Sequence, residues 1–539
     1  MNELQWNTPA SLRRLLTELV SWDSRTLTEG ECTFPLKLAD KLRTLTYFQE
    51  HPEQLKLHDA GSGRNSVLAL YKHPGARDTI VLISHFDTVW TEEYGALEPL
   101  ATQPEELTAA LYAIAHELPE DARQDLLSGD YLFGRGTMDM KMGLALHMAL
   151  IEKASAEQWP VNLLLLTVPD EEVNSAGMRT AAEELVRMRS DFDLDYKLFL
   201  NSEPTFSQEP GDPKEYVYSG TIGKIMPAAL CYGKETHVGE PLKGLTATYI
   251  SSFLTGEMEF NPLFRETSYG ESAPLPVSLQ VKDLKTAYST QTPYRAASLF
   301  NVFLMDRSAS EIMDLFEEAA ARAMASCNER YQAICRREGT EPVGEVRILR
   351  YEELVSYATS KIGTAAVDTV IANTVSDPAL DDREKCFKIT DALLIECQEL
   401  TPAAVLLFAP PFYPAVNTSE DPLVIRSIEL MKHTARSLGT EVDQIHFFNG
   451  ICDLSYVHYT GSREGWTAYE QNTPVWGRTY SIPFDAMTAL DAPVLNVGPF
   501  GKDAHQRTER LHIESAFVRL PHMLETLVKS LRPTTAETP

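Results

Sequence analysis

The stretch TIVLISHFDTVW, residues 79–90, joins an apolar strand to two polar side chains at its exit. Residues 80–83 are all aliphatic and predict a short buried strand. Because side chains two apart on a strand point to the same face, His85 and Asp87 can meet beyond its carboxyl end. Open α/β sheets place their ligand sites there. An imidazole held by a carboxylate is the usual form of a metal-binding histidine, although an ordinary histidine beside a surface acid gives the same pattern.

The composition is that of a large, acidic globular protein. The chain has 539 residues, of which 43% are hydrophobic and 23% charged, and its net charge is −29. We expect no nucleic-acid partner, because an acidic surface repels phosphate backbones. The seven cysteines are scattered and form no CxxC pair, which indicates a reducing compartment without a disulfide framework. With no apolar leader and no aliphatic run long enough to span a bilayer, we expect a cytoplasmic protein without membrane contact.

Further metal-ligand types follow the later strands and turns. In chain order they are Asp139 in the glycine-rich turn 134–143, Glu171 and Glu172 after the strand 162–168, Glu203 after the strand 197–201, and His505 after the strand 493–497. Each alone fits a simpler alternative, such as a capping aspartate or the acidic first turn of a helix. Together they predict that two histidines and three or four carboxylates converge on one sheet edge. Such a set makes a two-metal site of nitrogen and oxygen ligands.

Five motifs carry a family resemblance. They are SHFDTV (84–89), GRGTMDMKMG (134–143), PDEEVNSAG (169–177), SEPT (202–205) and GPFGKDAHQRTE (498–509). In this order they resemble the M20 family of metallopeptidases and amidohydrolases, which are co-catalytic dizinc enzymes. The length of the chain, the TEGE sequence at 28–31 and the APPFYP sequence at 409–414 further resemble the arginine-utilisation (RocB-type) branch.

The resemblance assigns a role to each candidate residue. It implies that His85 and Glu203 bind one divalent metal ion, that Glu172 and His505 bind a second, and that Asp139 bridges the two. The remaining two roles fall to Asp87, which would orient the His85 ring, and to Glu171, which would be the general base. Zinc is the default metal for such ligands, and cobalt or manganese would fit the same set.

The implied function is that of a dimetal hydrolase. It would cleave an amide bond of a small peptide or N-acyl amino acid through a water between the metals. The resemblance to the arginine-utilisation branch implies a place in arginine or amino-acid catabolism. The alternative is a non-catalytic regulator that binds a metal or ligand on the same fold. The presence of Glu171 and of every ligand favours the enzyme.

The expected fold is α/β, with a mixed, mostly parallel sheet covered by helices on both faces, as in zinc exopeptidases. We expect a catalytic domain in two parts, 1–219 and 418–539, around an inserted α+β lid at 220–417. The resemblance implies a homodimer formed through the lid, in which His237 reaches the partner's site and steadies the oxyanion. The segment 91–130 and the helical insertion 351–400 receive no chemical role.

Two positions depart from the family pattern. Met142 stands where the family usually has a glycine after the bridging aspartate, and the lid lacks the usual Asn before Ile-Pro. Arg295 in the corresponding stretch either meets a substrate carboxylate or is a solvated surface residue.

Overall fold

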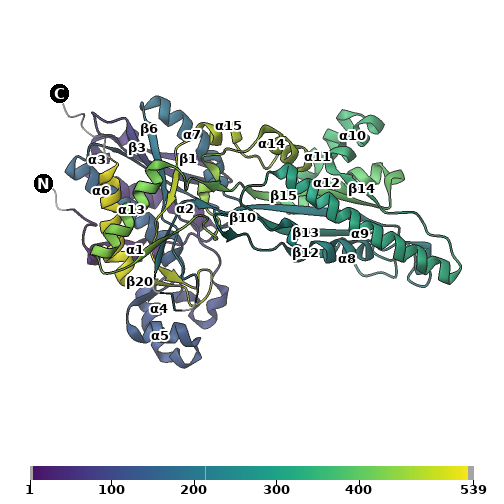
Figure 1. The fold of residues 1–539 in the computed structure, drawn as a ribbon, viewed down its shortest axis with the longest axis horizontal. Coiled ribbons are helices and arrows are strands. Elements are labelled where there is room, and N and C mark those ends of the chain that lie inside the picture. Colours follow the sequence, from purple (N-terminus) through teal and green to yellow (C-terminus); the bar gives the residue numbers. More distant parts are fainter. Residues whose placement is uncertain (1–3, 210, 213, 532–539) are drawn as a thin grey trace. The chain divides into compact units, whose positions relative to one another are not determined.

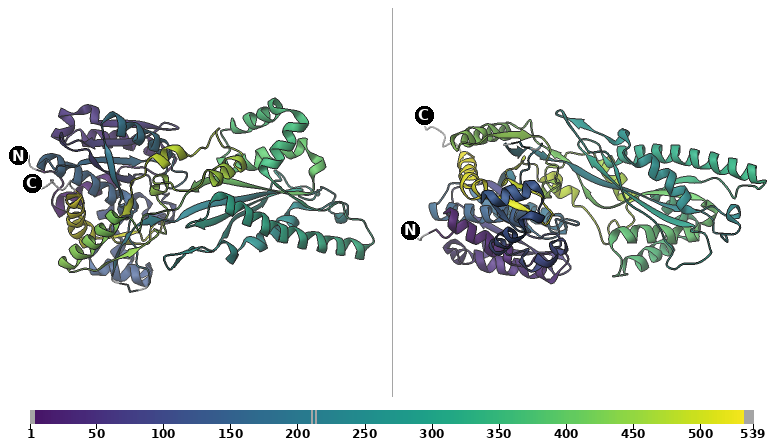
Figure 2. Two further views of the ribbon diagram at one scale, coloured as in Figure 1. Left: turned by 45° about the horizontal axis from the view of Figure 1, so that its top comes forward. Right: turned by 90° about the horizontal axis from the view of Figure 1, so that it is seen from below.

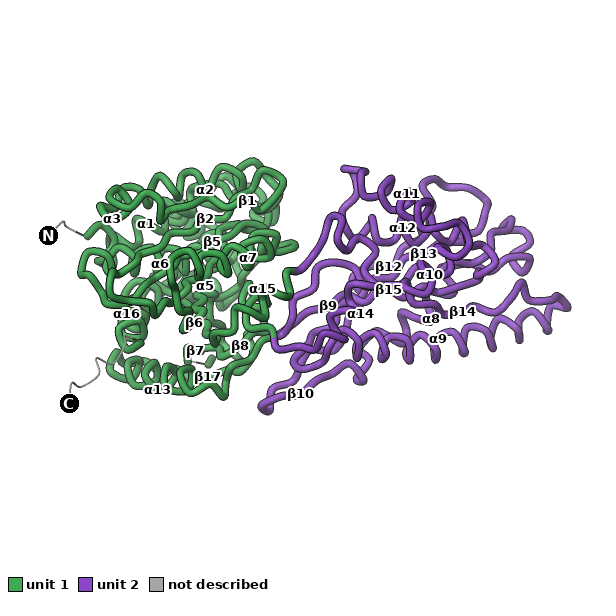
Figure 3. The backbone as a smooth tube through the Cα atoms, turned by 90° about the horizontal axis from the view of Figure 1, so that it is seen from above, with its two compact units in different colours: residues 1–221, 416–459, 483–539 green, residues 222–415, 460–482 purple. Residues whose placement is uncertain are grey.

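The computed structural model describes residues 4–209, 211, 212 and 214–531. The chain forms two compact units (Figure 3). Unit 1 contains the residues up to Thr221, Val416–Tyr459 and the residues from Pro483 onward, and unit 2 contains Ile222–Ala415 and Thr460–Ile482. The sequence-based division did not anticipate that Thr460–Ile482 would pack with unit 2, because this segment follows catalytic-domain residues without a break in composition. None of the helices in the described ranges is both long and apolar enough to cross a membrane.

Unit 1 is built on an eight-stranded mixed sheet, in the order β1-β2-β5-β3-β6-β18-β7-β17. The strands are β1 Leu55–Gly61, β2 Arg64–Tyr71, β3 Asp78–His85, β5 Asn162–Val168, β6 Asp195–Asn201, β7 Glu215–Tyr218, β17 Val442–Ile445 and β18 Val494–Asn496. The pairs β5/β3, β3/β6, β6/β18 and β7/β17 are parallel, while β1/β2, β2/β5 and β18/β7 are antiparallel. The predicted mixed, mostly parallel sheet is confirmed.

Helices cover both faces of this sheet. Every residue of β5 and all but the first residue of β3 are buried, and successive side chains on a strand face opposite sides. One face joins a core with helices α1 Pro9–Ser21, α2 Glu29–Leu42, α6 Met142–Glu157, α13 Pro422–Ser437 and α16 Leu520–Ser530 (Figure 1). The other face packs against α7 Ala176–Asp191, whose buried residues lie outside that core.

The strand pairing brings the candidate residues to one edge of the sheet. In the parallel register His85 lies opposite Val168, and Ile83 lies opposite Asn201. Strand β18 pairs with β6 so that Asn496 lies opposite Asn201. The loops that leave β3, β5, β6 and β18 therefore start from the same edge, as expected for the carboxyl ends of parallel strands.

A small sheet and a helical excursion flank this edge. Strands β4 Tyr131–Phe133, β19 Gly501–Lys502 and β20 Arg510–His512 form a three-stranded sheet, and the loop between β19 and β20 carries His505. The excursion contains η2 Glu92–Leu100, α4 Pro104–Leu111, η3 Tyr112–Glu117 and α5 Glu120–Ser128 around its own small core. Helix α4 has Pro104 in its first turn, and the chain tightens into a 3-10 helix at Tyr112.

Unit 2 is a five-stranded sheet with helices, in the order β12-β13-β9-β15-β14. Its strands are β9 Gly223–Tyr232, β12 Val277–Asp283, β13 Arg295–Leu304, β14 Arg347–Arg350 and β15 Ala403–Tyr413. Its main helices are α8 Ala247–Met258, α9 Ala309–Glu338, α10 Tyr351–Ile362, α11 Thr364–Val375, α12 Asp382–Glu396 and α14 Arg463–Asn472. The long helix α9 runs beside the sheet in both views of Figure 2. The expected α+β character of this region is confirmed, and the insertion 351–400 is helical as predicted.

Short sequence features mark the ends of three helices in unit 1. Helix α2 begins with the acidic first turn formed by Glu29 and Glu31, and the short α3 Thr46–Glu50 follows it. Helix α13 is capped by Asp421, whose carboxylate accepts the amides of Leu423 and Val424. Helix α16 has Pro521 in its first turn and follows a π-helical turn at Ser515–Arg519.

The central strand β3 should carry more stability than the sheet's edge. We predict that Leu82→Ala, at a fully buried position on β3, lowers the free energy of unfolding by about 2–5 kcal/mol, because it leaves a cavity. The same substitution at Leu57 on the edge strand β1, where the side chain is 37% exposed, should cost well under half as much. Chemical denaturation of the two variants measures both values, and equal losses would contradict the assignment of the core.

Candidate metal centre

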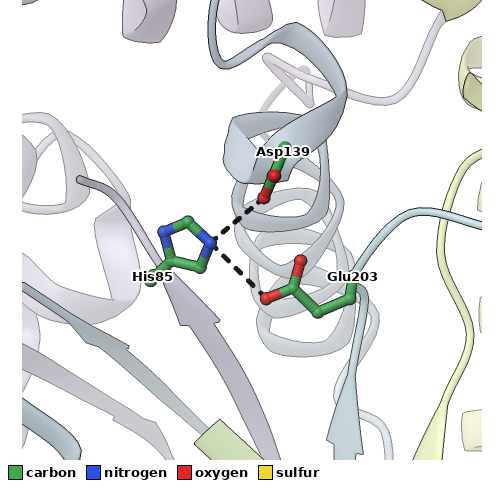
Figure 4. Close-up of side chains that lie close together, drawn as sticks. All are labelled: His85, Asp139 and Glu203. Carbon is green, nitrogen blue, oxygen red and sulfur yellow. Dashed lines mark ion pairs between the residues drawn. The ribbon is translucent and has the colours of Figure 1, made fainter. Parts of the chain in front are cut away.

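Two groups of metal-ligand types lie side by side at the carboxyl edge of the sheet. The first contains His85, Asp139 and Glu203, with one donor atom of each within 4.8 Å of the others. His85 Nε2 lies 3.3 Å from Asp139 Oδ1 and 3.5 Å from Glu203 Oε1 (Figure 4). All three side chains are largely buried, so these atoms converge away from bulk water.

The second group shares Asp139 with the first. It contains Asp139, Glu172 and His505. His505 Nε2 lies 3.0 Å from Asp139 Oδ2 and 3.2 Å from Glu172 Oε2. The two oxygens of one carboxylate thus serve different groups, Oδ1 the first and Oδ2 the second. The geometry brings together all five of the sequence-predicted ligands.

The turn that presents Asp139 depends on two close approaches. Asp139 has an extended backbone, with φ −116° and ψ 100°, between the left-handed Gly136 and the start of α6. A Cβ on Gly136 would lie 2.8 Å from Thr88 Cγ2, and a Cβ on Gly143 would lie 2.6 Å from the Ser202 carbonyl oxygen. Glycine is therefore required at both positions for the turn to press Asp139 against the strand ends. The unusual Met142 is the first residue of α6 and is fully buried, so it serves as core.

Glu171 lies beside the first group but belongs to neither group. Its Oε2 is 3.9 Å from His85 Nε2. Burial raises the pKa of Glu171 well above its usual value; His85 opposes this shift, and Asp453 and Glu203 add to it. Asp453, on the 3-10 turn Asp453–Tyr456, is itself only 2% exposed. This electrostatic coupling indicates that Asp453 lies near Glu171.

The protonation of the two histidines follows from the carboxylates around them. Burial alone would lower the pKa of His85, but Glu203, Asp139 and Asp87 together raise it well above its usual value. Hydrogen bonds to Asp139 and Glu172 raise the pKa of His505 to about 11. Each group therefore strongly favours positive charge at its centre. Imidazole nitrogen with carboxylate oxygen is also the donor chemistry that divalent metals such as zinc prefer, so the residues fit two metal ions.

Asp87 contacts its surroundings differently from the expectation. His85 Nδ1 donates to the main-chain oxygen of Asp87 at 3.0 Å, whereas the nearest carboxylate oxygen is 3.6 Å away. The carboxylate instead accepts the backbone amides of Glu171 at 3.1 Å and Glu172 at 3.3 Å, and the hydroxyl of Thr26 at 2.6 Å. The main-chain oxygen of Asp87 thus holds the His85 ring. The Asp87 carboxylate instead holds the loop that carries Glu171 and Glu172. Thr26 was not foreseen, since nothing in the spacing links positions 61 residues apart.

A buried ion pair lies between the two segments that carry Asp139 and His505 of the second group. Arg135, 1% exposed, pairs with Glu509, 0% exposed, at 2.5 Å, and Arg135 also contacts Glu93. Burial raises the pKa of Glu509 to about 7, although Arg135 lowers it. Both residues lie within motifs that were singled out for other residues, GRGTMD and DAHQRTE, and their pairing had no signal of its own. The pair joins the turn that carries Asp139 to the loop that carries His505.

His237 is not among the residues gathered at this edge. It lies in unit 2, in the loop that follows β9, and its side chain is exposed. Its Nδ1 accepts the amide of Gly239 at 3.1 Å, and its backbone bridges to Gln291.

The fold and these two donor groups define a metallopeptidase. The family model "Peptidase family M20/M25/M40" matches residues 81–459, and the chain belongs to this family. It is 40% identical over 535 residues to the uncharacterized protein YqjN of Bacillus subtilis (strain 168), covering 98% of this chain and 97% of that protein. It is 30% identical over 560 residues to protein RocB of the same organism, covering 99% and 98%. The solved structure of an M20 family metallo-carboxypeptidase, Sso-CP2 from Sulfolobus solfataricus, superimposes with a TM-score of 0.54 at 12% identity, covering 96% of this chain and 98% of that one.

The Arg135–Glu509 pair generates a double-mutant test. Arg135→Met should lower the free energy of unfolding by about 3–5 kcal/mol, because it leaves the Glu509 charge buried without its partner. Adding Glu509→Gln should recover most of that loss. Thermal or chemical denaturation of the single and double variants measures the coupling, and strictly additive losses would contradict the pairing.

Proposed function

We propose that the protein is a two-metal hydrolase that cleaves an amide bond of a small peptide or an N-acyl amino acid. One observation carries the proposal: Asp139 gives one oxygen to each donor group, and Glu171 lies beside them without belonging to either. This is the arrangement that a two-metal hydrolase needs, with a shared ligand between the sites and a further carboxylate beside them that belongs to neither donor group.

His85, Asp139 and Glu203 would hold one ion, and Asp139, Glu172 and His505 the other. When bound, two divalent ions supply a water of lowered pKa and polarise the scissile carbonyl. We propose zinc on the basis of the mixed nitrogen and oxygen donors, with cobalt or manganese as metals that suit the same set.

Glu171 would move the proton. In the role we propose, its carboxylate accepts a proton from the attacking water and then donates it to the amide nitrogen as the C–N bond breaks. The burial that raises its pKa makes it a better base than an exposed glutamate. The backbone amide of Glu171 donates to Asp87 Oδ1 at 3.1 Å, and this bond limits how far the Glu171 carboxylate can move away from His85.

The substrate would come from amino-acid metabolism. The full-length similarity to protein RocB supports the arginine or amino-acid catabolism that the sequence motifs suggest. Arg295 is engaged within unit 2, where its Nη1 lies 2.5 Å from Asp391 Oδ2, so we do not assign it a substrate carboxylate. The seven cysteines are all free, which supports a reducing, cytoplasmic location.

We further propose a homodimer formed through unit 2. Strand β12 pairs with β13 alone in the described part of the chain, and it exposes Leu279 by 52% and Val281 by 47%. An open, apolar edge strand is a surface that pairs readily with a second copy. In that dimer, exposed His237 would reach the partner's site and donate to the developing oxyanion.

A non-catalytic regulator on the same fold is the alternative function. It would have no use for Glu171, a carboxylate outside both donor groups. The presence of Glu171 in this chain therefore supports a catalytic function.

The general base gives the first functional prediction. Glu171→Gln should lower kcat by about 10²–10⁴-fold on whichever dipeptide, tripeptide or N-acyl amino acid the wild type hydrolyses, because the amide cannot accept the proton. Metal content should stay at the wild-type level, since Glu171 lies outside both donor groups. Glu183→Gln, at an exposed position on α7, is the matched control and should retain full activity. A Glu171→Gln enzyme as active as wild type would exclude this base.

The dimer proposal predicts complementation between subunits. Glu171→Gln and His237→Ala homodimers should each be nearly inactive. Exchanged mixed dimers should recover activity, because one site then has both an intact base and an intact partner histidine. Activity of dissociated and reassembled mixtures measures this, with single-variant mixtures as controls. Mixed dimers that stay inactive would refute the role of His237 in trans.

A further inference from the structure

The segment of residues 24–31, which leads into and opens helix α2, lies along the exit of strand β3. Thr26 donates its amide to the Thr88 carbonyl at 2.9 Å, and Thr88 donates its amide to the Ser24 carbonyl at 3.2 Å. The Ser24 hydroxyl donates to the Phe86 carbonyl at 2.7 Å. These bonds fix the segment to the backbone on both sides of Asp87.

This attachment places the Thr26 hydroxyl on the Asp87 carboxylate. The hydroxyl donates to Oδ2 at 2.6 Å, and both residues are buried. The same carboxylate accepts the amides of Glu171 and Glu172 at 3.1 and 3.3 Å. The hydroxyl bond is the shortest of the three and comes from outside the acidic loop, so it sets the direction in which the carboxylate presents its oxygens.

A second set of contacts, made by Glu31 and Arg64, holds the other end of segment 24–31. Glu31, fully buried on α2, accepts the Leu27 amide at 2.7 Å, where Leu27 has a left-handed φ of 64°. Arg64 on β2 lies 3.8 Å from Glu31 Oε1 and 2.6 Å from Asp170 Oδ1.

Asp170 completes the path at the acidic loop itself. Its main-chain oxygen accepts the Ser175 amide at 2.6 Å, and its carboxylate accepts the Ala176 amide at 3.0 Å. The contacts therefore close a ring that runs from segment 24–31 through Asp87 to the loop 170–175, and back through Arg64 and Glu31.

We propose that Thr26 is a positioning residue for the reaction, acting through Asp87 to hold the loop that carries Glu171 and Glu172. The proposal rests on the proposed function in one respect, that Glu171 is the base whose placement limits turnover. Without the hydroxyl, Asp87 Oδ2 keeps only the weaker bond to Glu172, and the carboxylate can rotate away from both amides. Residues that orient metal ligands and their neighbours in this way typically matter 10–100-fold for activity or metal affinity.

The test compares three substitutions in the same segment. Thr26→Val removes the hydroxyl at constant size, and Thr26→Ser keeps it. Thr28→Val is the matched control, because the Thr28 hydroxyl donates only locally, to the Arg25 carbonyl at 2.6 Å. Thr26→Ala repeats the comparison if the valine variant does not fold. Each variant is measured for kcat and KM, for melting temperature, and for hydrogen exchange of the Glu171 and Glu172 amides in the metal-free protein.

The positioning role predicts that Thr26→Val lowers kcat about 10–100-fold with KM little changed. It also predicts faster exchange of the Glu171 and Glu172 amides. Thr26→Ser should restore both properties, and Thr28→Val should match wild type in both. The inference is overturned if Thr26→Val leaves exchange and kcat unchanged, if serine does not rescue them, or if Thr28→Val causes the same losses.

Failure of the proposed function is distinguishable from failure of this inference. If the wild type hydrolyses none of the dipeptides, tripeptides and N-acyl amino acids tested, the proposed function is contradicted. Hydrogen exchange of the Glu171 and Glu172 amides in the metal-free protein still decides whether Thr26 holds the loop.

Discussion

The two oxygens of Asp139 contact different histidines, Oδ1 His85 and Oδ2 His505. The sheet and the turns of unit 1 hold Asp139 in the position that these two contacts require. A carboxylate can be shared in this way only if the strand ends and turns that carry the other donors meet within a few ångströms. Parallel pairing of β5, β3 and β6 supplies this, since it aligns the exits of three strands at one edge. The glycines at 136 and 143 then let the turn of Asp139 approach those exits. Gathering buried carboxylates costs free energy unless cations accompany them, so the fold commits this edge to binding positive charge.

Support for the site comes from a layer of contacts behind the donor atoms. The Asp87 carboxylate holds the amides of Glu171 and Glu172, and its main-chain oxygen holds the His85 ring. The buried pair of Arg135 and Glu509 joins the turn that carries Asp139 to the loop that carries His505. Each of these contacts fixes two segments at once, which is how a site on loops acquires the rigidity of the sheet beneath it.

The structure brings together the donor residues that the sequence motifs indicated, because strand and turn patterns are local. Residues 80–83 and 163–166 are continuous aliphatic runs, and polar residues that follow each run mark the sheet edge. The sequence predicted the support poorly, because the Thr26–Asp87 and Arg135–Glu509 contacts join positions far apart in the chain and leave no periodicity. The contacts of the Asp87 carboxylate also differ from the expected orientation of the His85 ring, because they too depend on residues far away in the chain. Two-residue spacing places His85 and Asp87 together, but it does not reveal that the amides of Glu171 and Glu172 compete for the carboxylate. The return of Thr460–Ile482 to unit 2 likewise depends on packing that composition does not record.

The most direct test of this account is the metal content per chain of wild-type protein and of Asp139→Ala, determined by mass spectrometry after dialysis against zinc. Glu203→Ala and His505→Ala serve as controls, because each removes a donor from one group only. The account predicts about two ions per wild-type chain, loss from both groups when Asp139 is removed, and retention of about one ion in each control. A single ion in the wild type, or loss of only one ion from two in Asp139→Ala, would contradict the shared ligand on which the structure of the site depends.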